Sequence, residues 1–132
     1  MLEIARKRAA QLGVEVDLRL GDAQRLEFAD ASFDSAACTL SLCTIPDDRA
    51  AVAEIKRVLR PGGRLLLLEH VRSPVEAIRA GQRLLEPLAV RFEGDHLLRD
   101  PLDHLMAQGF EIEQMLRSKL GIVERVAARK PA

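Results

Sequence analysis

The sequence predicts an α/β layered domain, because two kinds of apolar pattern alternate along it. Several segments carry apolar residues at helical spacing, and shorter stretches between them have the period-two or continuous apolar character of strands. Glycine and proline stand at many of the junctions, where the chain must turn. The predicted order of elements is α-β-β-α-β-α-α-β-β, and 132 residues suit a single domain.

The first helix is predicted over residues 2–12, and it ends at Gly13, a residue type that often closes helices. Residues 14–20 then alternate between apolar and charged side chains. A period of two with one hydrophilic face is typical of an edge strand, so we expect this strand to end at Gly21.

A second strand is predicted over residues 33–40, with small side chains in its middle. The helix that follows can be capped by Asp47 or Asp48, and the Pro-Gly-Gly segment 61–63 ends it. Residues 65–68 are four consecutive leucines, apolar on both faces. We therefore expect this strand in the interior of the sheet, with helices on each side.

The next helix is predicted to start at a capping box, because residues 73–76 read Ser-Pro-Val-Glu, with proline at the first helical position. Its apolar residues extend to Leu85. Glu86 and Pro87 then predict an irregular stretch that reaches about Arg99.

The C-terminal part is predicted to hold one short helix and two strands. The helix begins at Pro101 and ends at Gly109. Its inward-facing residues are expected to be Leu102, Leu105 and Met106. The strands, residues 110–117 and 122–129, are expected to form an antiparallel pair around Gly121.

Composition excludes several classes of protein. Twenty basic and twenty acidic residues give no net charge, which argues against a nucleic-acid or anionic-membrane binder. No apolar run approaches the roughly 20 residues of a membrane-spanning helix. Cys38 and Cys43 form neither a Cys-x-x-Cys motif nor a disulfide framework, so a reducing, cytoplasmic location is expected.

Several segments together resemble one enzyme family. They are Gly21-Asp22-Ala23, Phe33-Asp34, Thr39-Leu40-Ser41-Leu42, the helix-to-strand segment Val58-Leu59-Arg60-Pro61-Gly62-Gly63, Glu69-His70-Val71, Glu86-Pro87 and Gly94-Asp95-His96. In this order and spacing they resemble class I S-adenosylmethionine-dependent methyltransferases, in the group of ubiquinone/menaquinone and small-molecule thiol or lipid methyltransferases. The resemblance covers nearly the whole chain and implies a Rossmann-like sheet in a single domain, residues 1–132.

The resemblance also implies positions for the methyl donor, S-adenosyl-L-methionine. Asp22 matches the acidic residue that accepts a hydrogen bond from the adenine amino group, and Ala23 the next residue, whose N–H faces the ring. Thr39, Leu40 and Ser41 match the strand end that lines the methionine side. In open α/β sheets ligands lie beyond the carboxyl ends of strands, which agrees with these positions. The alternative for Asp22 is a purely structural role, in which its side chain only caps the next turn.

The sequence departs from the family where the family's first two strands, its Gly-rich turn and its ribose-binding acidic residue would stand. We therefore expect a partial sheet that lacks those two strands, which the family places between its third and fourth. Met1 could be an internal start, a partner chain or homodimer could complete the sheet, or the remaining strands could close up. The implied function is methyl transfer to a small-molecule acceptor; the alternative is an inactive or partner-dependent fragment that does not bind the donor alone.

His70 is the candidate catalytic residue, because it ends the central strand beside the expected donor and imidazole exchanges protons near neutral pH. It could equally only hydrogen-bond the strand end. Cys43 could face the substrate, although buried inert cysteine is commoner. Asp95, His96 and Asp100 match no zinc spacing, so no metal site is predicted. Residues 71–100 are expected to cover a small, apolar methyl acceptor.

Overall fold

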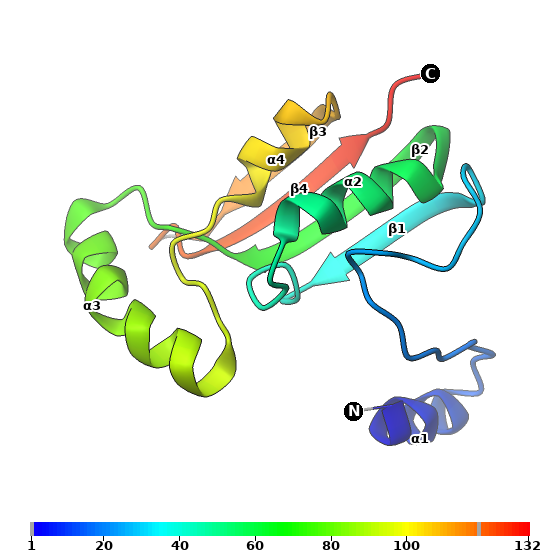
Figure 1. Ribbon diagram of the computed structural model, residues 1–132, viewed down its shortest axis with the longest axis horizontal. Helices are drawn as coiled ribbons and strands as arrows, with labels where there is room; N and C mark the ends of the chain where they lie inside the picture. Colours follow the sequence, from blue (N-terminus) through cyan, green and yellow to red (C-terminus); the bar gives the residue numbers. More distant parts are fainter. Residues whose placement is uncertain (1, 119) are drawn as a thin grey trace.

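The computed structural model describes residues 2–118 and 120–132, and at its centre is a four-stranded mixed sheet (Figure 1). The strands are β1 (Phe33–Thr39), β2 (Leu59–His70), β3 (Glu111–Arg117) and β4 (Val123–Arg129), in the spatial order β1-β2-β4-β3. β1 pairs with β2 in parallel, and β4 runs antiparallel to both β2 and β3. The expected C-terminal antiparallel pair is confirmed.

Two helices lie on the same face of the sheet (Figure 1). They are α2 (Asp48–Val58), which begins where the Asp47 side chain accepts a hydrogen bond from the Ala50 N–H at 2.9 Å, and α4 (Pro101–Ala107). The core forms between these helices and the strands. Its largest buried members are Leu42, Val52, Leu59, Leu65, Leu67, Leu105 and Phe110.

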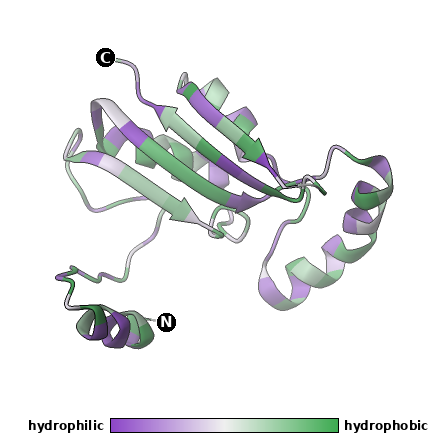
Figure 2. Ribbon diagram, turned by 180° about the vertical axis from the view of Figure 1, so that it is seen from behind, coloured by the Kyte–Doolittle hydropathy of each residue, from purple (hydrophilic) through white to green (hydrophobic). Residues whose placement is uncertain are grey.

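The opposite face of the sheet has no helix over it among the described residues (Figure 2). Along β2, Leu65 and Leu67 are buried, whereas Leu66 between them is 51% exposed. The expectation that helices cover this strand on both sides is therefore wrong for the described chain. A run of leucines has the same pattern whether its second face is covered or open, and only the packing partner distinguishes the two cases.

The expected strand over residues 14–20 is not formed. α1 (Leu2–Leu12) ends as predicted at Gly13, which has a φ of 63°. The segment after it has no ladder partner, and Val14 and Val16 are 54% and 51% exposed. Alternating apolar and charged side chains suit a strand, but a strand forms only where a neighbouring strand shares its backbone hydrogen bonds. Among the described residues, no strand pairs with this segment or with the outer edge of β1.

Helix α3 (Glu76–Glu93) runs straight through the predicted irregular stretch. Pro87 lies inside it, and the helix ends only at Gly94, in the left-handed conformation. Apolar residues at helical spacing continue to Phe92, so the periodicity, rather than the proline, marks the extent of the helix. The predicted capping box is also absent, because the N-cap residue, Val75, makes no side-chain capping bond. The Ser73 hydroxyl donates to Leu120 O at 2.6 Å and accepts from the Val75 N–H at 3.1 Å.

Helix α4 matches the expected position but not every expected contact. Leu105 is fully buried, while Met106 is 63% exposed and does not face inward. The Pro-Gly-Gly segment falls within the first residues of β2 rather than forming a separate turn. A Cβ at Gly63 would lie 2.8 Å from Arg60 O and 3.1 Å from Asp34 O, so only glycine fits where β2 passes β1. No described helix is long and apolar enough to cross a membrane.

Candidate functional site

A buried carboxylate organises the chain at the carboxyl ends of β1 and β2. Glu69, the penultimate residue of β2, is 1% exposed. Its two carboxylate oxygens accept hydrogen bonds from the Ser41 N–H at 3.1 and 3.0 Å, and Oε1 also accepts from the Leu42 N–H at 3.3 Å. The Cys38 thiol donates to the same Oε1 at 3.3 Å. The loop after β1 is therefore held by a side chain of the neighbouring strand.

Leu40 makes this arrangement possible through its backbone. Its φ is 49°, in the left-handed region that side chains with a Cβ rarely adopt. Its N–H still donates to Leu68 O at 2.8 Å, as a continuation of the β1–β2 ladder. The chain then reverses so that the next two N–H groups point at Glu69.

A second wall of the site is formed by residues 26–28, which have no regular secondary structure. Two residues of α2 hold them. Glu54 accepts from the Leu26 N–H at 2.8 Å, and Arg57 donates to Leu26 O and Phe28 O at 2.9 and 2.8 Å. The hydrogen bond from Arg57 lowers the pKa of Glu54 to about 2.

Two adjoining hollows lie along this wall. One, of about 390 Å³, is lined by Ala23, Thr39 and Ser41 among others, and the second, of about 410 Å³, is lined by Asp22 and Ala23. Their shared lining residues are Ala23, Leu26, Phe28 and Phe33. Leu40 lines neither. The structure thus brings four of the five residues proposed for donor contact to these two adjoining hollows, which are together called the depression below and are each within the size range of ligand pockets.

A third hollow, of about 440 Å³, lies on the open face of the sheet and is lined mainly by apolar strand residues such as Leu66 and Ala127. Its walls hold Gln114 and Arg125 but no carboxylate. Neither Asp22 nor Ala23 reaches it, and Thr39 is the only one of the five candidate donor residues in its lining. It is therefore the weaker candidate for a site that must recognise a charged, polar ligand.

Asp22 is exposed at the rim of the depression. Its Oδ1 accepts from the Gln24 N–H at 2.9 Å and from Gln24 Nε2 at 3.0 Å, and these hydrogen bonds, that of the side chain first, lower the pKa of Asp22. The turn-capping interaction is therefore formed. Gln24 Oε1 in turn accepts from the Asp47 N–H at 3.0 Å, which ties the turn to the start of α2. Oδ2 of Asp22 has no hydrogen-bond partner within residues 2–118 and 120–132.

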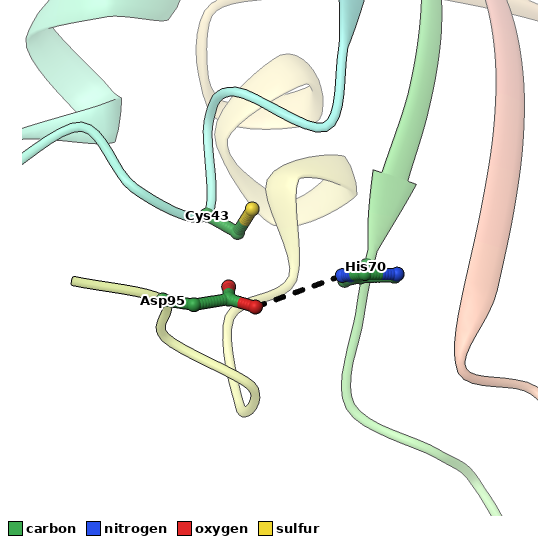
Figure 3. Close-up of side chains that lie close together, drawn as sticks. All are labelled: Cys43, His70 and Asp95. Carbon is green, nitrogen blue, oxygen red and sulfur yellow. Dashed lines mark ion pairs between the residues drawn. The ribbon is translucent and has the colours of Figure 1, made fainter. Parts of the chain in front are cut away.

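His70 lies at the end of β2 and faces Asp95, with 3.7 Å between His70 Nδ1 and Asp95 Oδ2 (Figure 3). The Cys43 thiol completes a cluster of three, and it is only 3% exposed. Burial, and then the hydrogen bond and charge of Asp95, raise the pKa of Cys43 to about 12. Without a bound cation the thiol therefore stays protonated at neutral pH.

Of the three residues Asp95, His96 and Asp100, the last two lie away from His70. His96 Nδ1 is 3.6 Å from Glu86 Oε1, and Asp100 Oδ2 is 3.1 Å from Arg117 Nη2. Only Asp95 of that group reaches His70.

Sequence reasoning missed Glu69 and Arg57 as parts of this site. Arg57, a charged residue in the last turn of α2, donates to two carbonyls of the 26–28 wall. Glu69 could have been found from its position, because it is a carboxylate in an otherwise apolar central strand. Burying a carboxylate is unfavourable unless hydrogen-bond donors contact it.

A family profile described as "Methyltransferase domain" matches residues 1–67, about half of the chain. The chain belongs to this methyltransferase family. It is 44% identical over 69 residues to a demethylmenaquinone methyltransferase of Deinococcus radiodurans, a match that covers 52% of this chain and 29% of the relative. It is 41% identical over 76 residues to a thiol S-methyltransferase of Rattus norvegicus, covering 56% and 31%. The matches thus span about a third of these relatives' lengths.

A solved structure shows the same fold. The crystal structure of a putative methyltransferase from Bacillus halodurans C-125 superposes with a TM-score of 0.80 at 19% identity, over 99% of this chain and 79% of the other. Together with the family match, this shows a domain of the methyltransferase family with a Rossmann-like fold.

Removing the Glu69 carboxylate should destabilise this methyltransferase domain. Glu69→Ala leaves the N–H groups of Ser41 and Leu42 buried without a partner, and each such loss costs about 1–3 kcal/mol. Glu69→Gln retains one acceptor oxygen and should recover part of the loss. Urea denaturation measures both against Glu111→Ala, at an exposed position of β3. Equal free energies of unfolding for Glu69→Ala and Glu111→Ala would contradict this role.

Proposed function

We propose that this domain binds S-adenosyl-L-methionine in the depression between residues 22 and 42 and transfers its methyl group to a small-molecule acceptor. The observation that carries the proposal is the joint lining of that depression by Asp22, Ala23, Thr39 and Ser41. These residues belong to different segments of the chain, and the two hollows that they line extend along the outer edge of β1, from Phe33 at its start to Thr39 at its end.

The residues present suit the donor. Asp22 has one carboxylate oxygen free of partners among the described residues, and this oxygen would accept a hydrogen bond from the adenine amino group. Ala23, with its small side chain, would let the ring approach the backbone. Phe28 and Phe33, whose ring centroids are 4.9 Å apart, give the depression an apolar wall. When bound, the donor supplies an electrophilic methyl group on its sulfonium sulfur.

His70 and Asp95 would act on the acceptor. The Asp95 carboxylate facing Nδ1 favours a proton on that nitrogen, which leaves Nε2 free to take the acceptor's proton. The His70 side chain is 43% exposed, so an acceptor can reach it. A base is needed only where the attacking atom carries a proton, as in a thiol or a quinol.

Residues 71–100 would cover the acceptor. They include helix α3, which has no buried residue and exposes Leu84, Leu88 and Phe92 by 79, 55 and 76%. Such a surface suits an apolar acceptor. The names of the two curated relatives, a demethylmenaquinone and a thiol methyltransferase, point to the same kind of molecule.

A second reading is that the chain needs a partner, or a second copy of itself, before it binds the donor. It rests on two features of the described residues: segment 14–20 and the outer edge of β1 both lack strand partners. Unpaired strand edges readily accept another chain.

Donor binding should depend on Asp22. Asp22→Asn keeps an acceptor for the Gln24 N–H but loses the charge, and it should weaken binding of S-adenosylhomocysteine by about 1–3 kcal/mol. Calorimetric titration measures the affinity, and Asp34→Asn, exposed in β1, is the matched control. Equal affinity of the two variants would refute the adenine assignment, and no binding by the folded parent chain would favour the partner-dependent reading.

Methyl transfer should depend on His70. With labelled donor, an aliphatic thiol or a naphthoquinol as acceptor, and a chelator present, His70→Gln should lower kcat by about 100-fold or more. Its affinity for S-adenosylhomocysteine should not change, because His70 lines neither donor hollow. His96→Gln is the control histidine. A kcat for His70→Gln equal to that of the control would remove His70 from the mechanism.

A further inference from the structure

We propose that Cys43, His70 and Asp95 form a binding site for a zinc ion. Their ligand atoms, a sulfur, a nitrogen and a carboxylate oxygen, all lie within 4.8 Å of one another. Thiolate, imidazole and carboxylate are the three side-chain groups that bind zinc in proteins. The inference goes beyond methyl transfer and requires no methyl donor.

The three residues come from separate parts of the chain, and one backbone and one side-chain hydrogen bond hold the Cys43 loop to the segment that follows Asp95. Cys43 lies in the loop between β1 and α2, and Asp95 follows the left-handed Gly94 that ends α3. The His96 N–H donates to Cys43 O at 2.9 Å, and Arg99 Nη1 donates to Leu42 O at 2.8 Å. The site is therefore assembled before any ion arrives, and its ligands need only small side-chain rotations.

An unpartnered oxygen points to a missing ligand at this place. Oδ1 of Asp95 is buried and has no hydrogen-bond partner, although a buried carboxylate oxygen normally has one. Other buried atoms of the described chain share this condition, among them Asp48 Oδ2 and Glu86 Oε2. Of these residues, Asp95 is the one beside both a thiol and an imidazole, so here a zinc ion bound to the carboxylate would offset the charge that the unpartnered oxygen shares.

The charges and distances fit zinc. A thiolate and a carboxylate offset the two positive charges, and the imidazole binds as a neutral ligand. Bond lengths of about 2.0–2.3 Å place neighbouring ligand atoms of a tetrahedral site about 3.3–3.7 Å apart. The 3.7 Å between His70 Nδ1 and Asp95 Oδ2 meets this already. The two separations to the Cys43 sulfur are at most 4.8 Å and must shorten by about 1 Å, which takes rotation of the Cys43 or Asp95 side chain as well as of the half-exposed His70 ring.

Three protein ligands leave a fourth position open to water or another small ligand. Sulfur and nitrogen donors disfavour magnesium and calcium, which bind through oxygen. Nδ1 of His70 cannot hold both a proton and a metal ion. With zinc on Nδ1, the one proton of the neutral ring lies on Nε2, so Nε2 cannot take a proton from the acceptor. Zinc binding and the proposed role of His70 as base therefore exclude each other.

The test is cobalt titration of the chelator-treated, full 132-residue chain. Co²⁺ bound to a thiolate gives a charge-transfer absorption that free cobalt and oxygen-bound cobalt lack. We expect this band to saturate at one ion per chain and to disappear when Zn²⁺ displaces the cobalt. Binding is read without donor or acceptor, so its failure is distinguishable from failure of the proposed methyl transfer.

Variants decide which residues bind the ion. Cys43→Ser should abolish the charge-transfer band, and the matched variant Cys38→Ser should keep it. His70→Asn, at a half-exposed position where folding is not at risk, should weaken Zn²⁺ binding by about 10-fold or more, whereas His96→Gln should not. The proposal is overturned by a parent chain with no thiolate band, by equal effects of the two cysteine variants, or by equal Zn²⁺ affinity of the two histidine variants.

Discussion

The buried carboxylate of Glu69 is the interaction on which the rest of the site depends. It bonds the backbone of Ser41 and Leu42 across the ends of two parallel strands, and it stabilises a loop whose preceding residue, Leu40, has an unfavourable φ. Without Glu69, the hydrogen bonds between strands would hold the backbone only to the end of β1 at Thr39. Because the loop is held, Ser41 lines the donor depression on one side and Cys43 faces Asp95 on the other. One side chain thus positions both the proposed donor pocket and the cluster around His70.

The same principle applies on the other wall of the depression. Residues 22–28 belong to no helix or strand, and two side chains of α2 and the backbone N–H of its N-cap residue bond them to the body of the domain. Glu54 and Arg57 bond the backbone of Leu26, and Asp47 bonds Gln24 of the Asp22 turn. The regular elements provide a rigid platform, and side-chain bonds to irregular backbone shape the site upon it.

The sequence predicted best where local pattern and tertiary packing agree. β1, α2, α4 and the β3–β4 pair lie where the apolar periodicity places them, and Gly13 ends α1 as expected. The predictions failed where the outcome depends on a neighbour. Segment 14–20 has the alternation of a strand but no partner in the described chain, and the leucines of β2 have a helix layer on one side only. The helix was predicted to end before Pro87 because proline interrupts most helices, whereas α3 continues through Pro87 to Glu93.

The site was predictable in part for the same reason. Family resemblance supplied Asp22, Ala23, Thr39 and Ser41 as candidates, and the structure places them in adjoining hollows. It could not supply the contact between Cys43, His70 and Asp95, which are far apart in sequence and meet only through the loops that Glu69 and Arg99 hold. Long-range side-chain contacts of this kind leave no periodic signal in a sequence.

The most direct test of the proposed donor site follows the backbone amide shifts by NMR while S-adenosylhomocysteine is added to the chain. The account predicts saturable shifts at Ala23 and Ser41 in the depression beside α2, and none at Leu66 and Ala127 on the open face of the sheet. Shifts confined to Leu66, Ala127 and their neighbours would contradict it, because the donor would then bind in the hollow that no helix covers.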